Sequence, residues 1–250
     1  YFVFTRYFIN PVKELSVVMS EIAHGNTEKL FSYPTNSQTE LSNVSKALKI
    51  FQENETKRRA AENEVRRLAM TDPLTGLANR NQFEKRFPEM ASLARRDKRL
   101  IALFALDLDK FKPINDTYGH AAGDTVLKNV ANNLLQIFRE TDLITRIGGD
   151  EFLVILYGPE NMEAVKIVAK RVLRLLSSPI MIDEDVVNIS TSIGIAIHEP
   201  YNTETVEVLI RRADKSLYVA KESGRNMYHI DNESQVDKPV RLIHKRPEKE

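Results

Sequence analysis

Apolar and polar positions change their period several times along the chain, and each change predicts an element. Residues 100–108 are almost entirely apolar, which indicates a strand buried on both faces. Residues 142–147 and 152–156 are shorter runs rich in β-formers, and Gly148-Gly149 between them predicts a two-residue hairpin turn. Apolar residues that recur every three or four positions predict helices over 81–96, 124–138, 161–176 and 205–222, and a short helix that begins with residues 111–115.

The C-terminal part of the chain adds the remaining strands. We expect a β pair within residues 186–197 and a closing strand at 226–230, with Gly224 as the C-cap of the preceding helix. Residues 232–250 are polar with mixed charges and predict a flexible tail. This order of elements predicts an α/β sandwich with a mostly antiparallel sheet flanked by helices, similar to the palm of polymerases and of class III nucleotide cyclases. Neither Gly-x-x-x-x-Gly-Lys nor Gly-x-Gly-x-x-Gly occurs, so a Walker or Rossmann nucleotide site is not indicated.

The first part of the chain has a different, all-helical character. Residues 1–10 are aromatic and apolar but too short to cross a bilayer, and we interpret them as the end of a truncated transmembrane segment, with a partly buried strand as the alternative. Pro11 opens a helix with apolar residues at three- and four-residue steps, residues 27–38 form a polar connector, and the same repeat restarts at Leu41. Two such helices within residues 11–53 resemble the HAMP relay module, which forms a parallel dimeric four-helix bundle. A plain helical hairpin is the alternative.

Residues 54–71 predict a helical linker. Continuing the heptad from Leu41 places Glu55, Arg58 and Glu62 where apolar seam residues belong, so the seam is poorly packed. Our hypothesis is that this helix has two accessible registers, through which an upstream signal changes how two copies of the next domain face each other. A merely solvated helix is the alternative explanation of these charges.

Composition narrows the classes of function. The 250 residues carry a net charge of +1, so the strongly basic face of a nucleic-acid-binding protein is not indicated. Cysteine is absent, which excludes disulfides, a thiolate metal site and a cysteine nucleophile. This absence also fits a reducing compartment.

Acidic residues follow two of the predicted strands. Asp107 and Asp109 close the apolar run 100–108, and Asp150 and Glu151 follow the hairpin turn. A charge at the end of a buried strand is costly unless it is paired or binds a metal. We therefore expect the sheet to bring Asp107 beside Asp150 in a carboxylate site for Mg²⁺ that grips nucleotide phosphates. The alternatives are a salt bridge between Asp107 and a nearby lysine, and a hairpin tip whose charges are merely solvated.

Four stretches of the chain resemble the GGDEF family of diguanylate cyclases. They are Asp72-Pro-Leu-Thr-Gly-Leu77, Asp107-Leu-Asp-Lys-Phe-Lys-Pro-Ile-Asn-Asp-Thr-Tyr-Gly-His-Ala-Ala-Gly-Asp124, Gly148-Gly-Asp-Glu-Phe152 and Ala220-Lys-Glu-Ser-Gly-Arg-Asn226. They occur in the family's order, and the resemblance covers residues 70–231, with the catalytic domain at 72–231. The family reaction joins two GTP molecules into cyclic di-GMP and releases two pyrophosphates. Each step is the attack of a ribose 3′-hydroxyl on an α-phosphate.

The resemblance also implies how the acidic residues act. The metal ligands would be Asp107, the Leu108 carbonyl, Asp150 and Glu151, with Mg²⁺ as the metal and Mn²⁺ as a substitute. Asp150 would also help to deprotonate the 3′-hydroxyl, and Glu151 would bind a second metal or position the first. The catalytic set is Asp150, Glu151 and Lys112. Catalysis of this kind is mainly positioning plus charge neutralisation.

Substrate-binding residues follow from the same motifs. Guanine would be read by Asn115 and Asp124, since a carboxylate accepts from N1 and N2 and an amide serves O6 or N3. His120 would line the same pocket. Capping or core packing is the alternative role for such residues. The phosphates would meet three cationic side chains, two backbone amides and the hairpin glycines. These are Lys112, Lys221, Arg225, Lys110, Phe111, Gly148 and Gly149.

Two further features complete the resemblance. The wide turn at 72–77 would dock the linker on the catalytic domain, with Pro73 ending the linker helix and Asn79 capping the next one. The segment 139–142 begins with Arg139 and ends with Asp142, and five residues separate it from Gly148. At this place the family has an inhibitory product site of the pattern Arg-x-x-Asp.

Arginine can bind O6 and N7 of guanine bidentately, and Asp142 would accept from another edge of the base. Arg171 would be a second contact of the product. An ordinary salt bridge between Arg139 and Asp142 is the alternative.

The expected protein is thus a feedback-inhibited diguanylate cyclase. One domain holds one GTP, so catalysis would need a homodimer, with GTP and cyclic di-GMP as ligands and no nucleic acid. The HAMP-like module suggests the cytoplasmic part of a protein of the bacterial inner membrane. A catalytically silent receptor for GTP or cyclic di-GMP is the alternative from another class. A phosphodiesterase is not supported, because these residues show no second acidic metal cluster.

Overall fold

The computed structural model describes residues 40–182 and 185–231, together with the isolated residues 13, 16, 17 and 20. The chain divides into two compact units, Tyr1–Ala69 and Met70–Glu250. The predicted transmembrane end at 1–10, most of the HAMP-like module and the tail at 232–250 lie outside the described residues. Among the described helices, none has the length and apolar character that a bilayer span requires.

The described part of the first unit consists mainly of one helix, α3 (Glu40–Met70), whose last residue already belongs to the second unit. The helix runs without a break past the predicted boundary between the HAMP-like module and the linker. The charges predicted at the seam pair with one another along the helix, because Arg58 bridges Glu55 and Glu62 one turn away on either side. Hydrogen bonds from Arg58 and Arg59 lower the pKa of Glu55 to about 2. The seam charges thus find partners within a single helix.

A five-stranded sheet forms the centre of the second unit, in the order β2-β3-β1-β6-β7. Its strands are β1 (Ile101–Asp109), β2 (Leu143–Gly148), β3 (Glu151–Tyr157), β6 (Ser190–His198) and β7 (Tyr228–Ile230). Strands β6 and β7 are parallel and the other neighbours are antiparallel, so the prediction of a mostly antiparallel sheet is confirmed. The central strand β1 is buried along almost its whole length, which explains its nearly unbroken apolar sequence.

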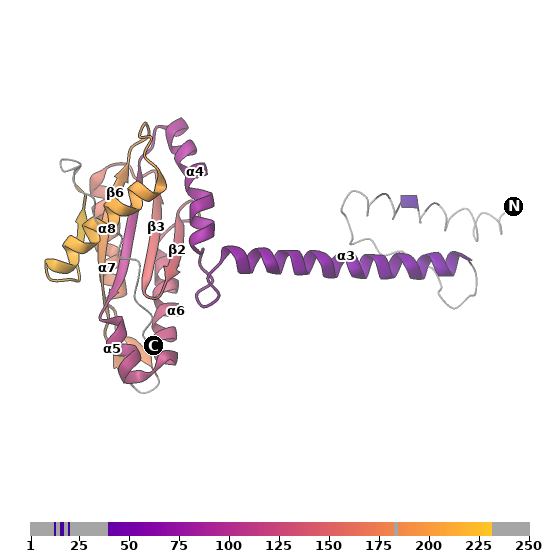
Figure 1. Cartoon of the computed structure of the whole chain (residues 1–250), viewed down its shortest axis with the longest axis horizontal. Coiled ribbons are helices and arrows are strands. Elements are labelled where there is room, and N and C mark those ends of the chain that lie inside the picture. Colours follow the sequence, from indigo (N-terminus) through magenta and orange to yellow (C-terminus); the bar gives the residue numbers. More distant parts are fainter. Residues whose placement is uncertain (1–12, 14–15, 18–19, 21–39, 183–184, 232–250) are drawn as a thin grey trace, which may run out of the picture. The chain divides into compact units, whose positions relative to one another are not determined.

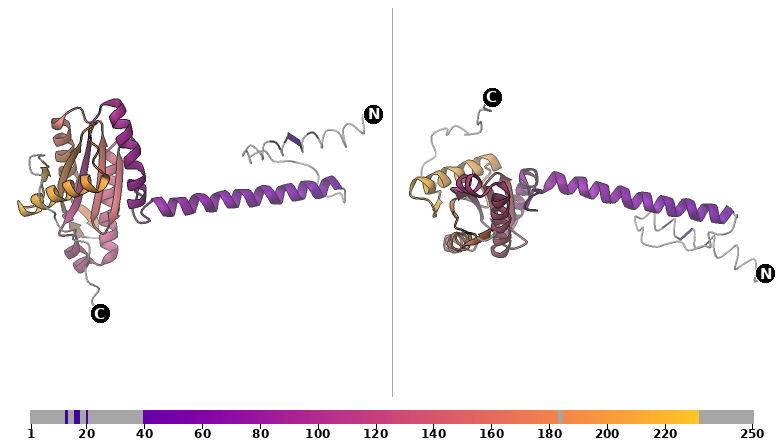
Figure 2. Two further views of the ribbon diagram at one scale, coloured as in Figure 1. Left: turned by 45° about the horizontal axis from the view of Figure 1, so that its top comes forward. Right: turned by 90° about the horizontal axis from the view of Figure 1, so that it is seen from below.

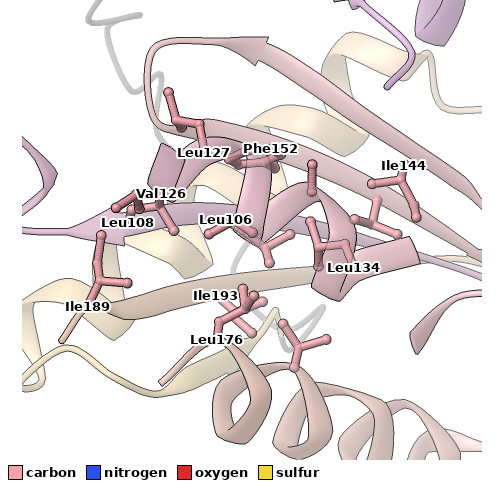
Figure 3. Close-up of a cluster of buried hydrophobic side chains, with 14 of the residues drawn as sticks. Leu106, Leu108, Val126, Leu127, Leu134, Ile144, Phe152, Leu176, Ile189 and Ile193 are labelled. Atoms are coloured by element: carbon pink, nitrogen blue, oxygen red, sulfur yellow. The ribbon is translucent and has the colours of Figure 1, made fainter. Parts of the chain in front are cut away.

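Helices cover both faces of this sheet (Figure 1, Figure 2). They are α4 (Arg80–Asp97), α5 (Phe111–Tyr118), α6 (His120–Ile137), α7 (Met162–Leu176) and α8 (Val206–Glu222). Alternate residues of β1 point to opposite faces, so Leu103 packs with α4 and α8, whereas Leu106 packs with α6 and α7. Figure 3 shows Leu106 in the hydrophobic cluster beneath α6 and α7, together with Val126 and Leu134 of α6.

Several predicted boundaries are confirmed. Helix α3 ends at Met70, shortly before Pro73, because proline disfavours the helical conformation in the residue that precedes it. Asn79 caps α4, and its side chain accepts a hydrogen bond from the Gln82 amide at 3.1 Å. The C-cap of α8 is Ser223 rather than the predicted Gly224, which is the next residue and has a φ of 122°, a conformation that favours glycine.

The hairpin turn differs from its prediction. Gly148 still pairs with Glu151 in the ladder between β2 and β3, so the turn consists of Gly149 and Asp150 rather than of Gly148 and Gly149. The pairing shifts register between Arg146 and Gly148. Because of this irregularity, β2 extends one residue further toward the turn than it would in an undistorted hairpin.

Two other elements differ as well. Helix α6 begins at His120, earlier than predicted, directly after Gly119, whose φ of 82° separates it from α5. The predicted β pair within 186–197 is wrong, because β5 (Asp185–Val187) pairs with β4 (Ile180–Ile182) in a separate two-stranded sheet. Strand β6 joins the central sheet instead. Propensity indicates that a segment is extended, whereas packing selects its partner.

Candidate active site

Acidic side chains from two neighbouring strands meet at one end of the sheet. Asp107, near the end of β1, stands directly opposite Glu151, the first residue of β3. Residues directly opposite each other on antiparallel strands project from the same face of the sheet. Asp150 precedes Glu151 in the hairpin turn. The fold therefore brings the two acidic strand ends together, although the residue in register with Asp107 is Glu151 rather than Asp150.

A lysine from α8 pairs with the aspartate of this edge. Nζ of Lys221 lies 2.7 Å from Oδ2 of Asp107. The salt bridge that was one of the two sequence interpretations of Asp107 is therefore present. The pKa of Asp107 is nevertheless raised, because burial disfavours the charged form and the charges of Asp150 and Glu151 add to that effect, with Lys221 offsetting it only in part.

The donor atoms at this edge suit a hard divalent cation. Mg²⁺ prefers carboxylate and carbonyl oxygens, and Asp107, Asp150, Glu151 and the Leu108 carbonyl offer only such donors. A bound cation would also counter the burial and the repulsion that together raise the pKa of Asp107. Within residues 40–182 and 185–231, however, no three His, Cys, Asp or Glu side chains are already grouped as a metal ion requires. The metal ligands therefore stay a prediction.

Arg146 on β2 holds the hairpin tip against the turn that follows α3. Its Nη1 lies 3.0 Å from both carboxylate oxygens of Asp72, and its Nε and Nη2 donate to the Gly149 carbonyl at 3.1 and 2.8 Å. Burial alone would raise the pKa of Asp72, but hydrogen bonds from Thr75 and Arg146 outweigh burial and lower it. Sequence reasoning gave this turn a role in docking the linker and missed its link to the hairpin. The available signal was an arginine inside an otherwise mostly apolar strand.

The predicted guanine-reading residues come from one helix pair. Asn115 is half-buried on α5, and His120 and Asp124 are exposed on α6. Asn115 lies against α6 where only glycine leaves room, because a Cβ on Gly123 would stand 1.9 Å from Asn115 Oδ1. The turn at Gly119 joins the two helices, so all three side chains belong to one compact substructure.

The predicted phosphate contacts come from two turns with left-handed backbone. Lys110, the N-cap of α5, has a φ of 60°, and Arg225, which follows α8, has a φ of 64°. Such residues cost energy unless they are glycine, and they persist where the surrounding structure enforces them. The first amides of a helix, here beginning at Phe111, lack intrahelical partners and favour anions. Lys112 and Arg225 are exposed, and Gly149 at the hairpin tip has a φ of 57°.

The residues of the predicted inhibitory site lie around the end of α6. Oδ2 of Asp142 accepts from the Arg139 amide at 2.8 Å, and its Oδ1 accepts from the Tyr157 amide at 3.0 Å. Burial raises the pKa of Asp142 against the effect of these amides. Arg171 on α7 donates through Nη2 to the Gln136 carbonyl at 3.4 Å, so it stands close to the end of α6. The fold therefore gathers the three residues, while their role in product binding stays a prediction.

Comparison with known proteins agrees with this geometry. The family model for the diguanylate cyclase GGDEF domain matches residues 69–227. The chain is 39% identical over 162 residues to the diguanylate cyclase DgcS of Shewanella oneidensis. The aligned region covers 65% of this chain and 53% of DgcS.

Two solved structures resemble the fold. The GGDEF domain of TpbB (YfiN) from Pseudomonas aeruginosa matches with a TM-score of 0.62 and 36% identity, over 65% of this chain and 94% of that one. The coiled coil and GGDEF domain of DgcB from Caulobacter crescentus, solved in complex with c-di-GMP, matches with a TM-score of 0.66 and 29% identity, over 75% of this chain and 98% of that one.

The matched region coincides with the unit that carries the acidic edge. The chain spans between 21% and 53% of the length of three curated relatives that it matches. The family model covers β1, β2, β3 and β6 of the sheet, the hairpin and the turn after α8, and it ends directly before β7. The chain therefore belongs to the family of diguanylate cyclase GGDEF domains.

Proposed function

We propose that this protein is a diguanylate cyclase that joins two GTP molecules into cyclic di-GMP with Mg²⁺, for which Mn²⁺ can substitute. The observation that carries the proposal is the acidic edge, where Asp107 stands opposite Glu151 and next to Lys221. Oxygen ligands for a metal and a cation for phosphates on one edge are what phosphoryl-group chemistry needs. The relatives named as diguanylate cyclases, and the cyclic di-GMP bound to DgcB, support the same reaction.

The acidic residues would prepare the attacking hydroxyl. A divalent cation held by Asp107, the Leu108 carbonyl, Asp150 and Glu151 would neutralise phosphate charge and favour an ionised 3′-hydroxyl. Asp150 accepts the proton of that hydroxyl, whose oxygen forms the new bond to the α-phosphorus as the bond to pyrophosphate breaks. With a cation held at Asp107, Lys221 would be available to pair with a phosphate oxygen.

The remaining predicted residues orient the nucleotide. Asn115 and Asp124 read the guanine edge, with His120 beside them, and Lys112 and Arg225 hold the β- and γ-phosphates together with the amides at the start of α5. This placement leaves the reacting phosphate next to the acidic edge. Positioning of this kind supplies much of the rate in such reactions.

Catalysis would require a homodimer, because one domain offers a single site and the reaction consumes two GTP molecules. Helix α3 would set how the two domains face each other. Replacing the charges of the seam by leucine should lock one register and shift cyclase activity strongly up or down. The substitutions are Glu55→Leu, Arg58→Leu and Glu62→Leu, and unchanged activity in the triple variant would remove the switching hypothesis.

Regulation and location are part of the same proposal. Residues 11–53 would relay an upstream signal as a HAMP-like module, and the protein would act at the cytoplasmic face of the bacterial inner membrane. Product bound at Arg139, Asp142 and Arg171 would inhibit the enzyme. The arrangement of these three residues around the end of α6 supports that assignment.

The decisive experiment is GTP turnover by the purified chain with Mg²⁺, with the product resolved by chromatography, beside Asp150→Ala. Cyclic di-GMP from the wild type alone supports both the activity and the role of Asp150. Omission of the metal should abolish product formation, and replacement with Mn²⁺ should restore it.

A catalytically silent receptor for GTP or cyclic di-GMP is the second candidate. It is favoured by the ion pair between Lys221 and Asp107 and by the lack of a ready three-residue metal group among the described residues. A wild type that binds GTP but forms no cyclic di-GMP, also when fused to a strong dimerisation domain, would establish the receptor. Product formation by that fusion would return the assignment to the cyclase.

A further inference from the structure

Asp109 is a buried carboxylate for which the proposed chemistry has no use. It is the last residue of β1 and only 6% exposed. Its Oδ1 accepts from Ser192 Oγ at 2.7 Å, and its Oδ2 accepts from Ser190 Oγ at 2.7 Å and from the Asn226 amide at 3.1 Å. A buried charge is tolerated when hydrogen bonds satisfy it in this way. Asp109 thereby ties β1 to β6 and to the turn after α8.

The turn after α8 needs an anchor, because it contains two consecutive left-handed residues. Arg225 has a φ of 64° and Asn226 a φ of 48°. A non-glycine residue holds such a conformation only where surrounding contacts enforce it. The Arg225 amide donates to the Ala220 carbonyl at 3.1 Å, and Ser177 Oγ donates to Asn226 Oδ1 at 3.2 Å. The bond from the Asn226 amide to Asp109 is the tether that joins this turn to β1.

The same aspartate also connects to the other half of the proposed phosphate site. The next residue after Asp109 is Lys110, the left-handed N-cap of α5. Lys112 lies in the first turn of that helix. Arg225 precedes Asn226, whose amide Asp109 binds. Asp109 therefore fixes the distance between the two turns from which phosphate ligands are proposed to come.

We propose that Asp109 is a positioning residue for the triphosphate, which holds the turn after α8 so that Arg225 stays beside the start of α5. The inference rests on the proposed function, because it assigns Arg225 to the β- and γ-phosphates of GTP. Loss of the tether releases the strained turn, and Arg225 then loses its fixed place. The part of the ligand that suffers is the pyrophosphate moiety, while guanine and ribose contacts remain.

The test compares two ligands of the full chain in the presence of Mg²⁺. The unreactive 3′-deoxy-GTP carries all three phosphates, whereas GMP lacks the β- and γ-phosphates. Asp109→Ala should raise the Kd for 3′-deoxy-GTP by about tenfold or more, since Arg225 loses about one charge-assisted hydrogen bond to the phosphates. The Kd for GMP should stay within about twofold. Asp109→Asn should fall in between, because its amide oxygen still accepts but without charge.

Two further variants separate positioning from general stability. Ser192→Ala removes a hydrogen bond of 2.7 Å from the same carboxylate but leaves the bond from the Asn226 amide to Oδ2 in place, so it should keep the preference for the triphosphate. Arg225→Ala should lose that preference, and adding Asp109→Ala to it should cost nothing more, since both changes remove one contact. Hydrogen exchange of the Asn226 amide should speed up in Asp109→Ala without any ligand.

The outcomes distinguish the inference from the function on which it rests. A wild type that binds neither nucleotide overturns the proposed function and this inference together. A wild type that prefers the triphosphate, with Asp109→Ala and Asp109→Asn keeping that preference, overturns the inference alone. A Ser192→Ala variant that loses the preference as completely as Asp109→Ala also overturns the inference, because the effect is then one of stability.

Discussion

Gly123 offers a sharp test of the proposed guanine site, because the structure makes its effect on binding separable from its effect on folding. An alanine Cβ at this position would stand 1.9 Å from Asn115 Oδ1 and 2.9 Å from its Cγ, where real Cβ atoms keep at least 3.0 Å. The Phe111 ring, at 3.1 Å, adds a tight contact on the same side. The end of the Asn115 side chain must therefore move by about 1 Å or more in Gly123→Ala.

The free energy of unfolding should change little. Alanine is favoured over glycine within a helix by about 1 kcal/mol. Forcing Asn115 away from its preferred rotamer costs about 0.5–1.5 kcal/mol. The two terms nearly cancel, so the Tm of Gly123→Ala should stay within about 4 °C of the wild type.

Binding of GTP should fall much further. Displacing Asn115 removes one or two hydrogen bonds to guanine, which are worth about 1–3 kcal/mol, or about 5- to 150-fold in Kd. Calorimetric titration with 3′-deoxy-GTP measures this loss, and thermal unfolding of the same samples measures stability. Asn115→Ala should show an equal loss, and the double variant should be no worse than either single one. A Gly123→Ala variant that binds within twofold of the wild type would refute the assignment of Asn115 to the base.

Three further outcomes follow from the described contacts. Arg146→Met should lower the free energy of unfolding by about 2–3 kcal/mol, because it leaves the largely buried Asp72 carboxylate without its charged partner and the Gly149 carbonyl without its donor. Equal midpoints of urea unfolding for the variant and the wild type would contradict this. That difference should be full above about pH 4 and shrink below it, because the pKa of folded Asp72 lies under its unfolded value and its contribution is lost as the folded form becomes protonated. A constant difference between pH 3 and pH 7 would speak against Asp72 as the partner that matters. Arg139→Ala should weaken inhibition by cyclic di-GMP about tenfold or more with initial rates unchanged, and an unaltered inhibition curve would exclude the proposed product site.

Local pattern was enough for most of the elements of the second unit. The step of three and four residues in α7 and α8, the cap at Asn79 and the stop before Pro73 all depend on neighbours in the chain, and the structure has them close to where they are predicted. The pairing of the strands, in contrast, depends on packing. Strand β5 is extended as predicted, but β4 and not β6 is its partner.

For the candidate site residues as well, the sequence identifies the side chains and the tertiary structure sets their neighbours. Asp107, Asp150 and Glu151 are recognisable from their places at strand ends and from the motifs around them. The tertiary structure alone decides that Glu151 is the residue in register with Asp107, because β1 and β3 do not follow each other in the chain and only the packing of the sheet sets their pairing.

The supporting contacts were beyond the reach of sequence pattern. Arg146 and Asp72 are 74 residues apart, and Asp109 and Asn226 are 117 residues apart. Periodicity and propensity report interactions within a few residues, so the sequence by itself determined the elements, the family resemblance and the candidate ligands. Only packing of the sheet against its helices decided which buried charges meet, because a hydrogen bond depends on the positions of atoms in space and not on their separation along the chain.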